Sequence, residues 1–289
     1  MISFGLRFHD SAVLPFEERL SAVKAQGFDC VHIALSKTEG LPSDNGALTP
    51  GYAAYLKKAF RNANLDMAVL GCYLNLAHPE PSALKEIQKT YMAHIRFASL
   101  TGCGMVGTET GAPNAEYRYD KESCHSRKAL ELFINNLRSV VEYAEKMGVI
   151  LAIEPVYKHI VYSPSVAREV LDTVSSPNLQ IIFDPVNLLH PDNLDRRDEV
   201  IKEAISLLGP DIAMLHLKDY IQKDGELVCT APGLGEMDYE RIIEFAVTKK
   251  PYIQATLEDT KPENAKQALS FLKELTAKHL PCEGTCRSL

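Results

Sequence analysis

Four residues that can bind a metal or move a proton end four successive apolar stretches in the second half of the chain. They are Glu154 in VILAIEP, Asp184 in LQIIFDP, His216 in IAMLHLKD and Glu258 in IQATLED. If these stretches are neighbouring strands, which lie about 4.8 Å apart, the four side chains meet in one small volume. Three carboxylates that close repel one another, and such clusters usually share a proton or bind a cation.

The types of these residues indicate which cation they would bind. Three carboxylates and one imidazole form an oxygen-rich set that suits Mn²⁺ or Mg²⁺, with Co²⁺ or Zn²⁺ also possible. We predict one divalent ion, Mn²⁺ before the others, bound by Glu154, Asp184, His216 and Glu258. The competing interpretation, that such a residue caps a helix or pairs with a lysine, fits a single residue better than four on successive strands.

Strand-like stretches must position these side chains, and eight of them recur along the chain. Each is short, apolar and rich in β-branched residues, as buried parallel strands are. The predicted strands are Ile2–Phe8, Cys30–Leu35, Met67–Leu74, Met105–Thr108, Val149–Glu154, Leu179–Asp184, Ile212–Leu217 and Tyr252–Leu257.

Eight stretches with helical spacing follow these strands one by one. In Ala129–Met147, apolar residues recur at the spacing of a half-buried helix, and Gly148 ends the pattern. The other predicted helices run from Phe16 to Gly27 and over Tyr52–Ala63, Ala83–Leu100, Ser165–Val174, Arg197–Leu208, Tyr239–Val247 and Glu263–Ala277.

Eight strand–helix repeats predict an α/β fold with a single (β/α)8 TIM barrel over residues 1–280. A doubly wound sheet is disfavoured, because no early turn carries its glycine-rich phosphate motif. Residues 281–289 read as a C-terminal tail, in which Cys282 and Cys286 lack a second pair that would complete a zinc site. After His216, the pair Asp224-Gly225 lies between two alternating stretches and predicts a β-hairpin inserted after the seventh strand. The hairpin is either a lid over the barrel mouth or a passive decoration.

Composition limits the partners. The net charge of −7 disfavours nucleic acid, and no apolar run is long enough to span a membrane. The start of the chain lacks the pattern of a secretory signal, and seven cysteines spread over 289 residues favour reduced thiols in the cytoplasm.

Several motifs together resemble a known family. EP at 154, FDPVN at 183, HLKD at 216, ED at 258 and the segment GLGEMDY that follows make the chain similar to the xylose-isomerase-like superfamily, in its sugar isomerase/epimerase branch that includes the ketose 3-epimerases. The resemblance covers nearly the whole chain. It implies that Glu154, Asp184, His216 and Glu258 bind one metal, and that Glu154 and Glu258 exchange protons with the sugar from opposite faces.

The sugar-binding positions of the ketose 3-epimerases are replaced here by Ile160, Asn187 and Gln222, so no particular ketohexose is predicted. Other polar residues lie where a barrel presents side chains to its mouth, among them His32, His78, Lys158, His159 and His190. The residues we predict to bind substrate are His9, Asn75, Glu109, Asn187 and Lys218. The alternative for Lys218 is an ion pair with Asp219.

The predicted function is a metal-dependent sugar isomerase or epimerase that moves a proton on a small keto sugar, polyol-derived or related carbonyl compound through an enediolate. A dehydratase of the inosose dehydratase type would use the same site. An apurinic-site endonuclease would need more metal ligands and a basic face, and a binding protein would bind without turnover. By analogy with other barrels, we expect a homodimer or homotetramer.

Overall fold

The eight predicted strands form a closed parallel barrel. A computed structural model describes residues 2–280, and in it the barrel runs in the order β1-β10-β7-β6-β5-β4-β3-β2. The strands are β1 (Ser3–Arg7), β2 (Cys30–Ile33), β3 (Asp66–Gly71), β4 (Met105–Glu109), β5 (Ile150–Glu154), β6 (Leu179–Phe183), β7 (Ile212–Leu217) and β10 (Gln254–Leu257). This confirms the predicted TIM barrel. The predicted tail with Cys282 and Cys286 lies outside the described residues.

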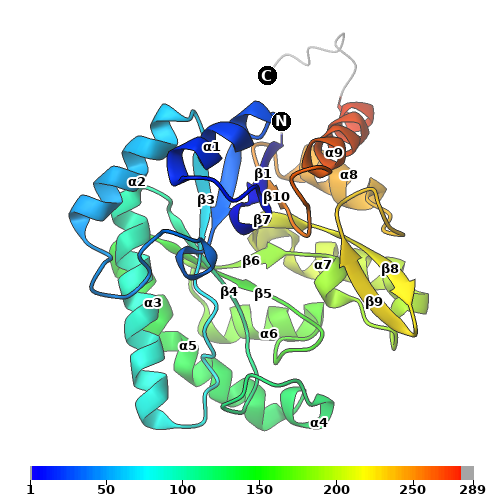
Figure 1. Cartoon of the computed structure of the whole chain (residues 1–289). Coiled ribbons are helices and arrows are strands. Elements are labelled where there is room, and N and C mark those ends of the chain that lie inside the picture. Colours follow the sequence, from blue (N-terminus) through cyan, green and yellow to red (C-terminus); the bar gives the residue numbers. More distant parts are fainter. Residues whose placement is uncertain (1, 281–289) are drawn as a thin grey trace, which may run out of the picture.

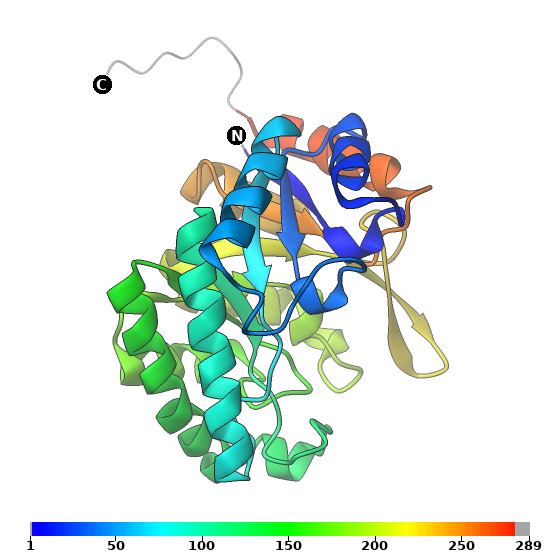
Figure 2. The ribbon, with the colours of Figure 1, turned by 60° about the vertical axis from the view of Figure 1, so that its left-hand side comes forward.

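Helices surround the barrel, as Figures 1 and 2 show. Their apolar faces pack on the outer side of the strands in one large core. They are α1 (Phe16–Ala25), α2 (Pro50–Asn62), α3 (Pro81–Thr101), α4 (Lys121–Cys124), α5 (Arg127–Met147), α6 (Pro164–Val174), α7 (Arg197–Leu208), α8 (Glu240–Lys249) and α9 (Ala265–His279). The short α4 was not predicted. Among the described residues, no helix combines the length and the apolar character needed to cross a lipid bilayer.

Local signals set the ends of α5. The Ser126 side chain accepts a hydrogen bond from the Ala129 amide at the start, and Gly148 takes a left-handed conformation (φ 65°) at the end. Several predicted strand boundaries are wrong. The second strand ends at Ile33 rather than Leu35, and the third ends at Gly71 rather than Leu74. The last strand begins at Gln254 rather than Tyr252, because Tyr252 has φ 73° in a turn and is 83% exposed.

The predicted hairpin is present. β8 (Asp219–Lys223) pairs antiparallel with β9 (Glu226–Thr230), and both views show it standing out from the barrel. Its turn residues Asp224 and Gly225 have φ of 53° and 80°, the left-handed pair that a two-residue turn requires. The hairpin leaves the barrel directly after β7, which places it beside the strand ends that carry the predicted site.

Candidate active site at the barrel mouth

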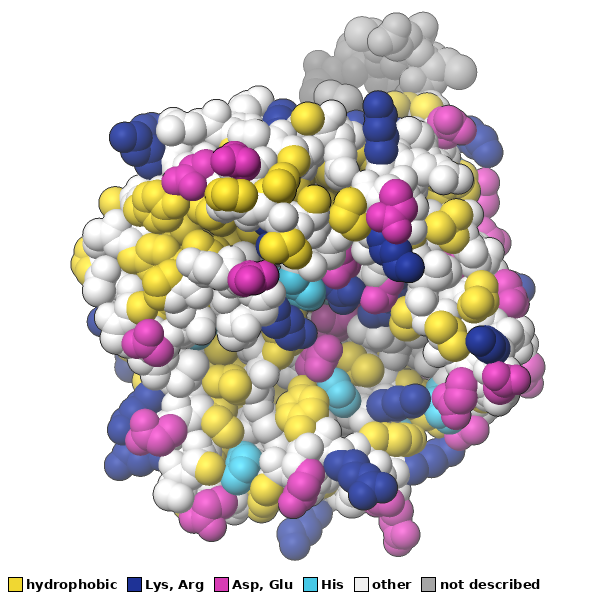
Figure 3. Space-filling model, viewed as in Figure 1, with side chains coloured by type: hydrophobic (Ala, Val, Ile, Leu, Met, Phe, Trp, Pro, Cys, Tyr) yellow, Lys and Arg dark blue, Asp and Glu magenta, His cyan; other side chains and the backbone are white. Residues whose placement is uncertain are grey.

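The four predicted metal ligands lie together at the carboxyl ends of four strands. Glu154 ends β5, Asp184 follows β6, His216 is the fifth residue of β7, and Glu258 follows β10. Each side chain is at least 94% buried. Figure 3 shows acidic, basic and histidine side chains around a hollow in the middle of the face drawn there. The barrel topology therefore brings together residues that are more than 100 positions apart.

His216 is the centre of this cluster. Its Nδ1 lies 3.2 Å from Glu154 Oε2 and 3.2 Å from Glu258 Oε1. Glu154, Asp184 and His216 each offer a ligand atom within 4.8 Å of the other two, and His32, His216 and Glu258 form a second such group. Neither ring nitrogen of His216 has a hydrogen-bond partner. Buried polar atoms that converge without hydrogen bonds are what a cation site requires, so these residues fit a divalent metal.

Two cations already balance the carboxylates. The Lys218 ammonium lies 2.8 Å from Asp184 Oδ2 and 3.3 Å from Glu258 Oε2. Arg7 donates to Glu258 Oε2 at 3.1 Å and also pairs with Asp10 and Asp259, each at 2.9 Å. These contacts fix the carboxylate of Glu258 from two directions.

The alternative ion pair between Lys218 and Asp219 is wrong. The Asp219 carboxylate instead accepts hydrogen bonds from the backbone amides of Tyr220, Gly233 and Met237, at 2.8 to 3.0 Å. It therefore ties the segment GLGEMD to the base of the hairpin. Gly235 is required there, because a Cβ at this position would lie 2.2 Å from the carbonyl oxygen of Tyr220.

Burial and charge oppose each other in setting the pKa values of the site. Burial raises the pKa of Asp184 to about 6, although Lys218 works in the other direction. Burial alone would lower the pKa of His216, but the carboxylates of Glu258 and Glu154 outweigh it and raise that pKa to about 9. Burial likewise acts to raise the pKa of Glu258, yet His216 and Lys218 hold it well below its ordinary value. A divalent cation on His216 would take the place of the proton, because both need the same ring nitrogen.

Besides Lys218, two predicted substrate residues lie beside the cluster. The Asn187 amide donates to Glu154 Oε1 at 2.5 Å. Glu109, at the end of β4, accepts from the Tyr117 hydroxyl at 3.2 Å. Burial raises the pKa of Glu109 to about 7, and the charge of Glu154 adds to the shift. Both side chains are partly exposed and can therefore meet a small molecule in the mouth.

The other two predicted substrate residues have different surroundings. His9 lies in a short 3-10 turn after β1, beside His32, and burial lowers its pKa to about 3. The buried Asn75 amide donates to the carbonyl oxygens of Ala112 and Asn114, each at 2.8 Å, and its oxygen accepts backbone amides. Since these bonds use both donor hydrogens, Asn75 holds the loops after β3 and β4 together, and we do not include it in the proposed substrate site.

Sequence reasoning missed two contributors, Arg7 and Tyr73, and placed His32 at the mouth without giving it a role. The His32 Nδ1 lies 3.6 Å from Glu258 Oε1, its ring stacks on that of His216 at 5.0 Å, and its Nε2 lies 2.7 Å from the Tyr73 hydroxyl. The alternation of β2 could have revealed His32, because a polar side chain within an apolar barrel strand needs a partner.

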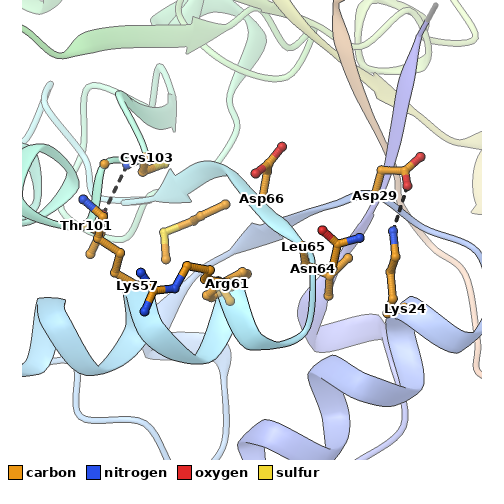
Figure 4. Close-up of a pocket in the computed structure, with 12 residues that line it drawn as sticks. Lys24, Asp29, Lys57, Arg61, Asn64, Leu65, Asp66, Thr101 and Cys103 are labelled. Carbon is orange, nitrogen blue, oxygen red and sulfur yellow. Dashed lines mark hydrogen bonds and ion pairs between the residues drawn. The ribbon is translucent and has the colours of Figure 1, made fainter.

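A second cavity lies at the opposite end of the barrel. Figure 4 shows it beside the ends of α1, α2 and α3, with Asp66 at the start of β3 and with Asp29 and Cys103 shortly before β2 and β4. Its volume is about 460 Å³, and its wall mixes Lys57 and Arg61 with the acids Asp29 and Asp66. TIM barrel active sites lie at the carboxyl ends of the strands, so this cavity is not the candidate site.

The sequence matches the family model of the xylose isomerase-like TIM barrel over residues 20–275. The chain belongs to this family. No curated protein sequence matches it.

Solved structures of similar fold extend over nearly the whole xylose isomerase-like barrel. A D-tagatose 3-epimerase-like protein has a TM-score of 0.74 at 19% identity, over 96% of this chain and 98% of that one. The probable 3-DHS dehydratase AsbF of Bacillus anthracis, involved in petrobactin synthesis, has a TM-score of 0.72 at 15% identity, over 95% of this chain and 99% of that one. A xylose isomerase-like TIM barrel protein of Mycobacterium smegmatis in complex with magnesium has a TM-score of 0.70 at 16% identity, over 96% of this chain and 97% of that one. At these identities the likeness shows the fold alone.

Proposed function

We propose that this chain is a divalent-metal-dependent isomerase or epimerase of a small keto sugar, polyol-derived or related carbonyl compound. The observation that carries the proposal is the placement of Glu154 and Glu258 on either side of His216, each with one carboxylate oxygen 3.2 Å from Nδ1. Family membership and a structural neighbour named for D-tagatose 3-epimerase support it.

Glu154, Asp184, His216 and Glu258 would hold the metal, for which we favour Mn²⁺ over Mg²⁺, Co²⁺ and Zn²⁺. A magnesium complex of a structural neighbour supports a hard divalent ion. When bound, the ion supplies positive charge that stabilises the anion formed as a carbon-bound proton leaves a position beside a carbonyl.

The protein's own residues move the proton. One of Glu154 and Glu258 removes it from the carbon beside the carbonyl, and the other returns a proton to the opposite face of the same carbon or to the neighbouring carbon. The first outcome is epimerisation. The second is isomerisation, in which the hydroxyl proton on the first carbon also passes to the former carbonyl oxygen. Asn187 holds the carboxylate of Glu154 and Arg7 holds that of Glu258, so each acts from a fixed position.

A dehydratase is the second candidate, because proton removal at the same site can be followed by loss of a hydroxyl. The structural neighbour described as a probable dehydratase supports it, and the Glu109 carboxyl beside Tyr117 is a group that could protonate the departing hydroxyl.

The net charge of −7 speaks against an endonuclease. Free thiols at all five cysteines of residues 2–280 support our proposal that the enzyme works in the cytoplasm.

The first test is the metal content of the wild-type protein, of His216→Ala and of the control His279→Ala, all prepared without chelator and reloaded with Mn²⁺. His279 lies at the end of α9, away from the mouth. We expect about one ion per chain in the wild type and the control, and none in folded His216→Ala. Absence of metal from all three would overturn the proposal.

The second test is the exchange of carbon-bound hydrogen for deuterium when keto sugars are incubated with the Mn²⁺ protein in D₂O. Exchange that disappears in Glu154→Gln and in Glu258→Gln supports an isomerase or epimerase. Release of water with formation of an unsaturated product would identify the dehydratase. Binding of metal and sugar without any exchange would identify a binding protein.

A further inference from the structure

A small cavity opens beside the candidate active site, between the hairpin and the loops after β5 and β6. Its volume is about 140 Å³. Its wall is formed by the apolar or aromatic residues Val156, Tyr157, Val186, Leu189, Pro191, Leu227 and Cys229 and by the polar residues Lys158, Asn187, His190 and Glu226. We call it the hairpin cavity. Neither the metal cluster nor the proposed proton transfer uses it.

Asn187 connects the hairpin cavity to the proposed chemistry. The residue lines the cavity, and its amide donates to Glu154 Oε1 at 2.5 Å. Its carbonyl oxygen accepts a hydrogen bond from the Tyr157 amide at 2.7 Å, which joins the two loops that form the wall. Asn187 is therefore the residue that contacts both Glu154 and the cavity.

The wall determines what kind of group fits. Charged side chains lie only at the rim, where Lys158 and Glu226 pair at 3.7 Å and are 52% and 64% exposed. Along the apolar side of the wall, formed by Val186, Leu189 and Leu227, a chain of hydroxyl groups would lose its hydrogen bonds to water, which is unfavourable. The volume is that of one ring, since an apolar cavity of about 150 Å³ in another protein binds benzene.

We propose that the substrate bears, beyond its reacting keto or polyol part, a ring-sized group of low polarity that occupies the hairpin cavity. This inference rests on the proposed function, because the reacting part must be held by the metal cluster. It assigns the hairpin a role in substrate selection: residues of β9 form the outer wall of the subsite, and a free five- or six-carbon ketose leaves it empty.

The hairpin itself provides matched variants. Leu227 and Cys229 are two positions apart on β9 and both line the cavity. Val228, between them, points to the other face, and both Val228 and Cys229 are exposed. Cys229→Trp and Leu227→Trp should fill the subsite, whereas Val228→Trp adds the same ring to the opposite face. The chain contains no tryptophan, so each variant has a single indole. Emission at shorter wavelength for the first two than for Val228→Trp would show that the cavity is filled.

The test compares 1-O-benzyl and 6-O-benzyl D-fructose with the corresponding methyl ethers. Their dissociation constants are measured by calorimetry on wild type and variants, loaded with Mn²⁺ and after chelation, with metal content measured on the same samples. We expect one benzyl ether to bind wild type about tenfold or more tightly than its methyl ether, as burial of a ring implies. The preference should vanish in Cys229→Trp and Leu227→Trp and remain in Val228→Trp.

Equal affinity for benzyl and methyl ethers in the wild type would overturn the inference. So would a preference that survives in both filled variants, or failure of all four ethers to bind the Mn²⁺ protein. Failure of the proposed function has a different signature. It shows as absence of metal or of hydrogen exchange, and a benzyl preference that persists after chelation would then still establish the cavity as a ligand subsite.

Discussion

Each of the two proposed proton-carrying glutamates has its own partners. Glu154 receives the amide of Asn187, whereas Glu258 is held by the cations Arg7 and Lys218. Partners of this kind orient the carboxylate oxygens, and their loss changes metal affinity or activity without removing a ligand. Two predictions follow at this scale.

Asn187→Ala should reduce Mn²⁺ affinity or hydrogen exchange by about 10- to 100-fold, because Glu154 loses the donor that orients it. The matched control is Asn193→Ala, which removes an amide from the same loop. That amide donates to the Leu188 carbonyl oxygen and not to Glu154. Equal effects of the two variants on metal binding, measured by titration, would contradict the assigned contact.

Arg7→Met should lower the free energy of unfolding by about 2 to 4 kcal/mol, less than for a fully buried pair, because the arginine side chain is 19% exposed. The substitution leaves the carboxylates of Asp10, Glu258 and Asp259 without the arginine cation. The control is Arg127→Met, since Arg127 also pairs with two carboxylates, Glu131 and Glu169, but on the exposed surface. Urea denaturation in chelator should show a much smaller effect for the control. Equal losses would show that burial of the Arg7 network does not matter.

At the scale of elements, strands in the barrel approach so closely that glycine is required at particular pairings. Gly5 of β1 lies opposite Cys30 of β2 and Thr256 of β10. A Cβ at Gly5 would lie 2.6 Å from the Cys30 carbonyl oxygen and 2.8 Å from Thr256 Cγ2. The closure of the barrel between its first and last strands therefore leaves no room for a side chain here.

Gly5→Ala should destabilise the protein by about 1 to 3 kcal/mol, because backbone atoms must move to admit the methyl group. The control is Gly51→Ala in the first turn of α2, where a Cβ meets no heavy atom closer than 4.0 Å. That variant should be neutral or more stable by up to about 1 kcal/mol. Thermal and urea unfolding measure both, and a neutral Gly5→Ala would mean that β1 can shift freely.

At the scale of the whole molecule, stability depends on pH through buried groups far from the site. His94 on α3 is 6% exposed, and its Nδ1 donates to the Thr90 carbonyl oxygen at 2.9 Å. Burial lowers its pKa in the folded protein. Below the ordinary pKa of histidine, about 6.5, the unfolded chain therefore binds more protons than the folded one, and the free energy of unfolding falls as pH falls.

His94→Gln should reduce the slope of the free energy of unfolding against pH below about pH 6.5. The reduction is at most about 1.4 kcal/mol per pH unit, because the substitution removes at most one proton from the difference in bound protons between the unfolded and folded states. The free energy of unfolding is measured by urea at pH 7 and pH 5 in chelator. Lys85→Gln on the exposed face of the same helix is the control and should keep the wild-type slope. Identical slopes in all three proteins would exclude His94 as the source.

The sequence by itself determined the repeating architecture and the four residues at the strand ends. Strand and helix periods, the helix end at Gly148 and the Asp224-Gly225 turn are local properties, so they can be recognised without knowing what packs against them. Even the position of Glu154 at the mouth follows from its place at the end of an apolar strand.

Only the tertiary structure decided which partner each polar side chain has. Arg7 reaches Glu258 because β1 closes the barrel against β10, a pairing of residues about 250 positions apart. Asn75 has the same strand-end signal as Glu154, yet its amide is used by the backbone of a neighbouring loop. The hairpin cavity depends likewise on how β9 lies against the loops after β5 and β6. Contacts of this kind depend on register and closure, which are properties of the whole barrel and leave no periodic trace in the chain.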